Sequence, residues 1–453
     1  MNPVNPEAPA KEGTLPANGG LKPTFYRWVI IALAFLITLV NYMDRSAIAY
    51  AIKPIKAEFG FDDAGIGLIA GAFGIGYMVM TLGGGILVDK YGSRSVWALA
   101  AVLWSGCTAC MGMASSFTVF FIVRTMLGLA EGPHFPALTR VVADWLPTNE
   151  RARSTAFGLA AVPLASAIGA PIITSLIEAY GWKLMFAILG TAGIIWAVVW
   201  YLLYRDYPEH STFVNDAELT IVREGKPINR DRKLAELKAH DLELGKTTWK
   251  FLLTNPSLVA NNFAFFGFGY LLFFAVTWLP EYFLRTYHLS LKEVGGYLIY
   301  PWLTSAVFLV AAGFISDYIW KKTGSMRASR THMIWICQLL SGLCFIPIMF
   351  NPALHVALVM ISLGLAFGLM PNACFYSINC DLAKDKAATS LGLMDMFLAL
   401  AGVLAPVITG KLTEITGNFN IAFLILTIFI LSSVVALLIL QRPDKTNLKM
   451  GTA

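Results

Sequence analysis

The sequence predicts an all-α polytopic membrane protein with twelve transmembrane helices in two six-helix bundles. Of its 453 residues, 57% are hydrophobic and 14% are charged, whereas a soluble domain has roughly 45–50% apolar and about 25% charged residues. Because one crossing of the bilayer takes about 20 residues, the chain is long enough for twelve crossings and their loops. The composition excludes a soluble protein, and a formal net charge of +6 indicates no nucleic-acid partner.

The chain starts with residues 1–26, which are rich in proline, glycine, alanine and asparagine and contain no continuous apolar run. This composition is neither that of a secretory signal nor that of a transmembrane helix, so we expect a disordered cytoplasmic tail. Apolar runs between polar breaks then predict twelve helices. They lie near residues 27–52, 64–88, 95–114, 117–143, 154–178, 182–204, 255–286, 293–319, 331–350, 354–381, 388–412 and 418–441.

One long polar segment, residues 205–250, separates the sixth predicted helix from the seventh. Part of it, RDRKLAELKAHDLELGK, has the pattern of an amphipathic helix. We expect this segment to be a cytoplasmic linker between an N-terminal bundle over residues 27–204 and a C-terminal bundle over residues 251–441. Residues 442–453 are expected to form a second cytoplasmic tail.

The distribution of basic residues predicts the orientation, because lysine and arginine accumulate in cytoplasmic loops. With both termini inside, six of the 34 basic residues fall in outer loops, and two, Arg45 and Arg124, fall within predicted helices. All the others lie on the cytoplasmic side. The asymmetry therefore predicts cytoplasmic N and C termini.

A repeated motif supports the division into two halves. The break after the second predicted helix reads GGILVDKYGSR, with Gly85, Asp89, Gly92 and Arg94, and the break after the eighth reads GFISDYIWKKTGSMR, with Asp317. Small glycines let helices approach closely, an aspartate can cap or pair at a helix end, and basic residues anchor the cytoplasmic interface. Two copies at equivalent positions favour a gate that closes and reopens over a plain basic loop.

Four ionisable residues lie inside predicted helices. Asp44 and Arg45 are adjacent in the first, and Arg124 and Glu131 lie seven residues apart in the fourth, on one helix face. A charge at the bilayer centre costs from roughly 2.5 to more than 10 kcal/mol, so such residues face a cavity or a partner. One interpretation is two static ion pairs that join the two helices. The other is a proton-coupled anion site, in which an arginine holds a carboxylate through its planar fork of donors while Asp44 and Glu131 exchange protons.

Several strings resemble the major facilitator superfamily and, within it, the anion:cation symporter family of bacterial galactonate and hexuronate importers and sialin-type carriers. The strings are NYMDRSAIAYA, GGILVDKYGSR and RTMLGLAEGPHFPALTRVVADWLPTNERARS. The resemblance covers almost the whole chain. It implies the major facilitator fold, whose two bundles enclose a cavity that opens alternately to either side, and a multi-pass protein of the bacterial inner membrane.

The resemblance also implies roles for single residues. Asp44 and Glu131 match the protonated acids of the galactonate importer, and Arg124 matches the arginine coupled to them. Arg45 and Tyr77 match groups that hold the substrate carboxylate.

Other positions depart from that importer. Val162 stands where it has a glutamine, Tyr376 where a tryptophan is expected, and Asp395 where it has an asparagine. Among the amides and aromatic residues of the C-terminal half, Asn262, Tyr376 and Asn379 are the first candidates for substrate binding.

Asp395 admits several interpretations. It could bind the amine of a zwitterionic substrate, serve as another proton site, or remain protonated and hydrogen-bond to substrate hydroxyls. It could also pair locally with a basic residue, although the seventh to twelfth predicted helices offer no basic partner.

The favoured function is proton-coupled uptake of an organic anion, such as a sugar acid. The alternatives are a zwitterionic or polycarboxylate substrate, for example an amino acid or a carboxylate siderophore, and a proton-antiporting exporter. The chain has no nucleotide loop, zinc motif or nucleophile elbow, so we do not expect an enzyme. We expect no metal, no cofactor besides the coupling proton, a small organic anion and the lipid bilayer as partners, and a monomer.

Overall fold

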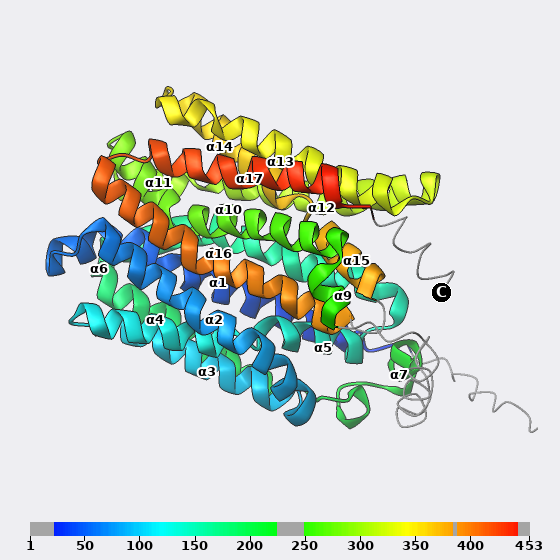
Figure 1. Ribbon diagram of the computed structural model, residues 1–453. Coiled ribbons are helices and arrows are strands. Elements are labelled where there is room, and N and C mark those ends of the chain that lie inside the picture. Colours follow the sequence, from blue (N-terminus) through cyan, green and yellow to red (C-terminus); the bar gives the residue numbers. More distant parts are fainter. Residues whose placement is uncertain (1–21, 224–248, 384–386, 443–453) are drawn as a thin grey trace, which may run out of the picture.

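The structure, a computed structural model, describes residues 22–223, 249–383 and 387–442. Every regular element in these residues is helical, and the long helices run side by side in one elongated bundle (Figure 1). The predicted amphipathic helix RDRKLAELKAHDLELGK and most of both predicted tails lie outside the described residues.

The N-terminal half contains six α-helices, followed by two short helices. They are α1 (Tyr26–Phe59), α2 (Asp63–Tyr91), α3 (Ser93–Met111), α4 (Phe117–Glu131), α5 (His134–Trp145), α6 (Thr148–Leu203), η1 (Pro208–His210) and α7 (Asp216–Arg223).

The C-terminal half follows the undescribed part of the linker. Its elements are α9 (Trp249–Thr254), α10 (Pro256–Thr286), α11 (Leu291–Tyr297), α12 (Ile299–Thr323), η2 (Arg327–Thr331), α13 (His332–Phe345), η3 (Pro347–Phe350), α14 (Leu354–Leu369), α15 (Asn372–Ala383), α16 (Ala387–Thr416) and α17 (Asn420–Leu440).

These bounds follow the predicted ranges to within a few residues at most ends, but α1 runs on to Phe59, the predicted helix 293–319 is divided into α11 and α12 at Leu298, and further differences occur at glycine and proline. α6 spans two predicted helices, and Gly181 separates its two segments with φ 79° and ψ 162°, a conformation that favours glycine. The predicted helix 117–143 is instead divided into α4 and α5 before Pro133, and the predicted helix 354–381 into α14 and α15 at Pro371. Proline lacks an N–H group and clashes with the preceding turn, so it ends a helix at these points.

Nine helical stretches in the described residues are long and apolar enough to cross a membrane. One of them, Phe157–Leu203, contains the break at Gly181 and so holds two of the predicted helices. α3 and the α4–α5 pair are not among the nine, and α4 alone has 15 residues. The all-helical membrane fold is therefore present, with nine such stretches in place of the twelve separate ones predicted.

The packing of the helices separates the two halves. Within the N-terminal half, α6 packs on α1 and α3, and α2 packs on α4; within the C-terminal half, α10 packs on α16 and α17, and α14 packs on α12 and α13. Four pairs join the halves most closely, namely α2 with α16, α6 with α12, α1 with α10, and α6 with α11.

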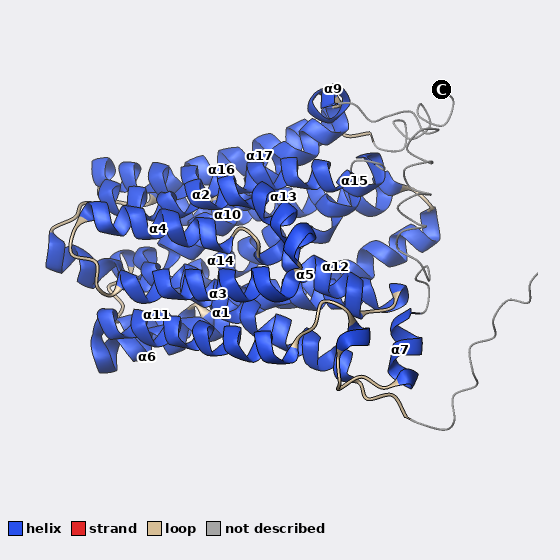
Figure 2. Ribbon diagram, turned by 90° about the horizontal axis from the view of Figure 1, so that it is seen from below, coloured by secondary structure: helices blue, strands red, loops and turns tan. Residues whose placement is uncertain are grey.

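The two ends of the bundle differ. At one end, here called the terminal end, Glu218 of α7 accepts a hydrogen bond from the backbone N–H of Arg27 at 2.9 Å, and the N–H of Arg442 donates to Ser257 Oγ at 2.9 Å. Both α7 and α9 lie at this end (Figure 2). The opposite end, here called the distal end, carries the loop between α1 and α2 and the break in α6.

Glycines bring α2 of one half into direct backbone contact with α16 of the other. A Cβ atom at Gly67 would lie 2.6 Å from Pro406 O, and one at Gly74 would lie 2.7 Å from the carbonyl carbon of Gly402. No side chain fits at such separations in a close-packed interior. The two halves therefore touch without intervening side chains along the distal part of α2.

Candidate functional site

An ion pair joins α1 to α4 inside the N-terminal half. Arg45 donates to Glu131 Oε2 from Nη2 at 2.5 Å and from Nε at 3.1 Å, and the two side chains are 4% and 0% exposed. The guanidinium carbon also lies 4.4 Å from the ring centroid of Tyr42, 4.6 Å from that of Phe73 and 5.1 Å from that of Tyr77. One carboxylate and three aromatic rings therefore hold Arg45 in place.

The other two charged residues of the predicted site form no ion pair within the described residues. Neither carboxylate oxygen of Asp44 has a hydrogen-bond partner, although the residue is 1% exposed. Arg124 Nε also lacks a partner, and its guanidinium lies 5.3 Å from the ring centroid of Phe73. Of the two static ion pairs considered from the sequence, the structure thus contains one.

Further unpartnered polar atoms surround these carboxyl groups. Glu131 Oε1, both amide atoms of Asn41 and the hydroxyl of Thr108 are buried without hydrogen bonds. Asn41 interacts with Glu131, and Thr108 of α3 interacts with Asp44, but neither pair has the geometry of a formed hydrogen bond. Because buried polar groups normally have partners, such a group is suited to bind a proton, a water molecule or a ligand.

His134, which follows this site at the start of α5, has both ring nitrogens engaged. Trp97 Nε1 donates to His134 Nδ1 at 3.2 Å, which leaves Nε2 as the protonated nitrogen of the neutral ring. His134 Nε2 lies 3.3 Å from Thr38 Oγ1, whose hydroxyl donates onward to Ala34 O. This chain of hydrogen bonds fixes α5 against α1 and α3.

Asp395 of α16 lies in the opposite half and has a tyrosine as its partner. The Tyr376 hydroxyl donates to Asp395 Oδ1 at 3.3 Å, and no lysine or arginine among the described residues pairs with this carboxylate. A local ion pair, one of the interpretations considered from the sequence, is therefore not formed in this part of the chain. From the N-terminal half, Tyr42 and Tyr77 interact electrostatically with Asp395.

A cleft lies between the two halves. Its lining is mostly apolar, with Tyr42, Val162 and Pro163 from the N-terminal half and Asn372 and Tyr376 from the C-terminal half among its walls. Two of the departures noted in the sequence, Val162 and Tyr376, thus face the space between the halves.

The predicted amides of the C-terminal half form a buried network. Asn379 Nδ2 donates to Asn262 Oδ1 at 3.1 Å and to Ser390 O at 3.2 Å, and Asn379 Oδ1 accepts from Asn261 Nδ2 at 3.0 Å. Gln441 Nε2 in turn donates to Asn261 Oδ1 at 2.9 Å. The network joins α10, α15 and α16 at the terminal end, and a role for Asn262 and Asn379 in substrate binding stays a prediction.

The predicted gating motif forms two contacts at the terminal end. Asp89 Oδ1 pairs with Arg140 Nη1 of α5 at 2.9 Å, and Arg140 also pairs with Asp144. Arg94 donates from Nε and Nη2 to the carbonyl of Tyr201 near the end of α6.

The backbone N–H of Arg94 donates to Asp206 Oδ1 at 2.9 Å, so Asp206 satisfies one of the free N–H groups at the start of α3. Gly92, with φ 82°, lies against the same carboxylate, and a Cβ atom there would be 2.5 Å from Asp206 Oδ2.

The expected role of Gly85 in close helix packing is wrong. A Cβ atom at Gly85 would meet nothing within 4 Å, whereas one at its neighbour Gly84 would lie 2.7 Å from Pro133 Cα. The helix turns by about 100° per residue, so only one of two adjacent glycines faces α5. The side chain of Asp317 lies outside the described residues.

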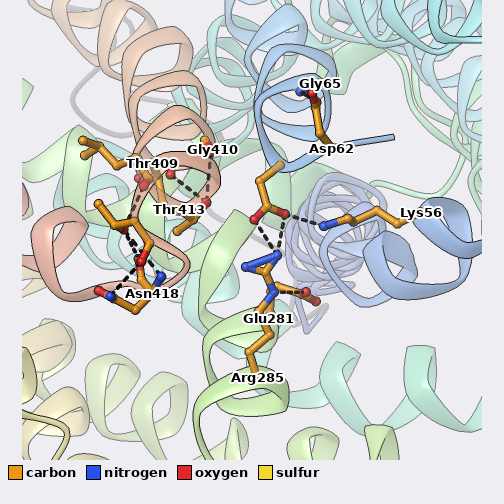
Figure 3. Close-up of polar contacts among 12 residues, drawn as sticks. Lys56, Asp62, Gly65, Glu281, Arg285, Thr409, Gly410, Thr413 and Asn418 are labelled. Carbon is orange, nitrogen blue, oxygen red and sulfur yellow. Dashed lines mark hydrogen bonds and ion pairs between the residues drawn. The ribbon is translucent and has the colours of Figure 1, made fainter. Parts of the chain in front are cut away.

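A cluster of charges joins the halves at the distal end (Figure 3). Asp63 at the start of α2 accepts from Lys56 of α1 at 2.5 Å and, through both oxygens, from Arg285 Nη2 of α10 at 2.5 Å. Arg285 Nε also donates to Glu281 at 2.8 Å. We call these four residues the distal charge cluster.

Sequence reasoning missed Tyr42, Arg140, Asp206 and the distal charge cluster. Tyr42 could have been found, because it precedes Arg45 by three positions and so shares its helix face. The partners of the cluster could not, since Asp63 and Arg285 are separated by 222 positions and neither shows a motif.

Two halves of apolar helices, a buried charged site and a cleft between the halves define a polytopic membrane transport protein, and not an enzyme. The chain belongs to the Major Facilitator Superfamily, whose family model matches residues 34–406. The resemblance noted in the sequence is thereby confirmed.

Relatives of known name are transporters of small organic anions. The chain is 30% identical to the probable galactarate/D-glucarate transporter GudP of Bacillus subtilis, over 94% of each chain. It is 29% identical to the hexuronate transporter of the same organism, over 87% of this chain and 90% of that one. It is 28% identical to the probable L-galactonate transporter of Escherichia coli, over 87% of this chain and 84% of that one.

Solved structures share the fold. A bacterial homolog to the human lysosomal transporter Spinster, in an inward-facing and occupied conformation, gives a TM-score of 0.69 at 18% identity, over 95% of this chain and 99% of that one. The inward-open xylose transporter XylE from E. coli gives a TM-score of 0.71 at 15% identity, over 92% of this chain and 97% of that one.

Proposed function

We propose that this protein is a secondary active transporter that couples the uptake of an organic anion, a sugar acid or a related carboxylate, to protons by alternating access. The observation that carries the proposal is the buried site of the N-terminal half. There Arg45 is paired with Glu131, while Asp44 and Arg124 have no ionic partner in the described residues.

The pair offers a physical route to coupling. A substrate carboxylate that reaches Arg45 competes with Glu131 for the same N–H donors. Once displaced, Glu131 would be a buried carboxylate without an ion pair, with only the longer-range attraction of Arg124, which is unfavourable, and a proton removes that penalty. Substrate binding at Arg45 and proton binding at Glu131 therefore favour each other. Each raises the affinity of the protein for the other, and this is what couples them.

Asp44 and Arg124 extend this site. Asp44 is a second carboxyl group without hydrogen bonds and can hold a proton independently of the Arg45 pair. Arg124 supplies a positive charge without an ion pair, which lowers the energy of an anion in the site. Tyr77, whose ring lies against Arg45, is placed to donate its hydroxyl to the same anion.

The relatives support the substrate class. Their names specify hexuronate, galactarate or D-glucarate, and L-galactonate, all of which carry at least one carboxylate beside several hydroxyl groups. A sugar acid of this kind is suited to a cleft with Tyr42, Asn372 and Tyr376 in its walls, because the ring of Tyr42 also lies against the buried Arg45.

Alternating access needs a gate at each end of the cleft. The distal charge cluster holds the halves together, and we assign it as the outer gate in its closed state. At the terminal end, Asp89 and Arg140 belong to one half and brace α2 against α5. The gating motif is thus suited to stabilise the state in which the terminal end is closed and the distal end is open.

The topology follows from the same elements. Counting α6 as two crossings and adding α3 and the α4–α5 pair to the other apolar stretches gives twelve transmembrane segments. The excess of lysine and arginine at the terminal end then predicts that both termini are cytoplasmic. We infer a monomeric carrier of the bacterial inner membrane, without a cofactor other than the coupling proton.

Uptake into proteoliposomes tests the proposal. Purified protein is first screened by thermal unfolding against D-glucuronate, D-galactonate and D-glucarate at two pH values, because a ligand raises the unfolding temperature. Asp44→Asn should abolish accumulation driven by a pH gradient while exchange of labelled for unlabelled substrate continues. The matched control is Glu58→Gln, an acid at the distal end of the same helix, which should keep both activities. If Asp44→Asn still accumulated substrate when a proton gradient was imposed, the proton role of Asp44 would be refuted.

A further inference from the structure

The carboxylate of Asp395 has no balancing charge in the described residues, although it belongs to the cleft region. Its one hydrogen-bond donor is the Tyr376 hydroxyl, at a long 3.3 Å. The residue is partly exposed, in contrast to the fully buried Glu131 of the other half. Because Tyr376 lines the cleft, Asp395 lies directly behind the cleft wall, and an ionised carboxylate at this place without a cation is unfavourable.

The arginines of the N-terminal half do not fill this role. Arg45 is committed to Glu131, and neither Arg45 nor Arg124 forms an ion pair with Asp395 in the described residues. The anion site and Asp395 are therefore separate poles, one positive in the N-terminal half and one negative in the C-terminal half. A substrate that spans the cleft meets opposite charges at its two ends.

Tyrosines surround the negative pole. Tyr376 contacts Asp395 directly, and Tyr42 and Tyr77 interact with it electrostatically from the opposite half. The faces of aromatic rings attract cations, most strongly in desolvated sites. Tyr42 and Tyr77 already show this behaviour toward the guanidinium of Arg45.

We propose that the transported substrate carries an ammonium group at the end remote from its carboxylate, and that Asp395 binds this group together with Tyr376. The inference rests on the proposed function, because it takes the carboxylate at the arginine side as given. It replaces a simple sugar acid with an amino-substituted one as the preferred substrate.

The charges argue against the two other kinds of remote end. A second carboxylate, as in galactarate, would lie beside Asp395 and be repelled, since like charges in a desolvated site interact unfavourably. A hydroxyl would accept or donate a single hydrogen bond and leave the aspartate charge unbalanced. A cation balances the ionised carboxylate and also meets the ring of Tyr376.

A series of three ligands isolates the charge at the remote end. D-Galactonate, galactarate and 6-amino-6-deoxy-D-galactonate share a six-carbon chain with a carboxylate at C1 and differ at C6, which is an alcohol, a carboxylate or an ammonium group. Dissociation constants are measured by thermal-unfolding titration of the purified full-length protein. The wild type should bind the ammonium compound about tenfold or more tightly than the alcohol, because a desolvated charge pair contributes at least that much. The diacid should bind most weakly.

Variants of the negative pole complete the test. Asp395→Asn should remove the preference for ammonium and improve binding of the diacid, whereas Asp395→Glu, which keeps the charge, should retain the wild-type order. Tyr376→Phe keeps the ring and should also retain it. The unfolding temperature without ligand reports whether each variant is folded. If Asp395→Asn is not folded, the order of the three dissociation constants in the wild type decides the test.

The outcomes separate this inference from the proposed function. Equal binding of alcohol and ammonium by the wild type overturns the inference and leaves the proposed function intact. The same holds if Asp395→Asn changes the pH dependence of binding but not the order of the three ligands, because Asp395 would then be a proton site. Binding of none of the three by the wild type overturns the proposed function, and the inference with it.

Discussion

Arg285 at the end of α10 binds both carboxylate oxygens of Asp63 at the start of α2, and this contact ties the two halves of the protein together. Both side chains are largely shielded from water, with 29% and 6% exposure. Lys56 of α1 shares the same carboxylate. Separation of the halves at the distal end must break the contact between α2 and α10 but can leave that between α1 and α2 in place.

Arg285→Gln should therefore open the distal end more often. Loss of the arginine leaves Asp63 paired with Lys56 inside one half, so that across the halves at this point only the longer-range attraction between Lys56 and Glu281 remains among the described residues. Hydrogen exchange measured by mass spectrometry should become faster at the distal ends of α2 and α10. Lys183→Gln is the control, because Lys183 pairs with Glu58 at the same end but within one half. Equal acceleration in both variants would show that Asp63 and Arg285 do not gate the cleft.

Glu131→Gln should lower the stability of the ligand-free protein strongly. Removing one partner of a buried ion pair leaves the other charge uncompensated, which costs about 3–5 kcal/mol. A substrate carboxylate then replaces the missing partner, so the rise in unfolding temperature on ligand addition should be larger than in the wild type.

Asp44→Asn provides the comparison for Glu131→Gln. Asp44 has no hydrogen-bond partner to lose, so its replacement should leave the ligand-free unfolding temperature unchanged or raise it. Equal destabilisation by the two substitutions would contradict the assignment of Glu131 as the paired acid and Asp44 as the unpaired one.

Two adjacent glycines should respond in opposite ways to alanine. Gly84→Ala places a methyl group 2.7 Å from Pro133 Cα and should destabilise the protein by about 1–3 kcal/mol. Gly85→Ala meets no atom within 4 Å and should stabilise it by about 0.5–1 kcal/mol, because alanine is the better helix former. Denaturant or thermal unfolding of the purified variants measures both. A larger loss of unfolding free energy in Gly85→Ala than in Gly84→Ala would support the expectation from the motif that Gly85 allows close helix packing.

Asp206→Ala should weaken the start of α3. The carboxylate accepts from the backbone N–H of Arg94 and acts as a helix cap supplied from a distant segment. Loss of such a cap costs about 0.5–2 kcal/mol. Asp206→Asn keeps an acceptor oxygen and should recover most of the loss, whereas an identical loss in both variants would mean that charge, and not the hydrogen bond, is what matters.

The sequence allowed the helices to be predicted better than their contacts. Apolar length places a helix in the membrane, and proline and glycine mark its breaks, so α1, α2, α10 and α17 agree with prediction to within a few residues at most ends. The merging of two predicted helices in α6 concerns only how the turn at Gly181 is counted.

The residues of the charged site could be predicted from the sequence, but the ion pairs between them could not. Charges are rare in apolar helices, which pointed to Asp44, Arg45, Arg124 and Glu131. Which acid meets which base depends on how α1 and α4 are rotated against each other, and a helix pattern in apolar surroundings does not fix that rotation. For the same reason Asn262 and Asn379, equally polar, turned out to be engaged in a buried network.

The contact of α2 with α16 has a consequence for leakage. Because backbone meets backbone at Gly67 and Gly74, and the side chains beside them, Val403 and Val407, are β-branched with few rotamers, little side-chain movement can fill a partly opened gap. The contact is thus either fully made or fully lost, so that it has two states. A carrier closed by a two-state contact spends little time half open, when protons could cross without substrate.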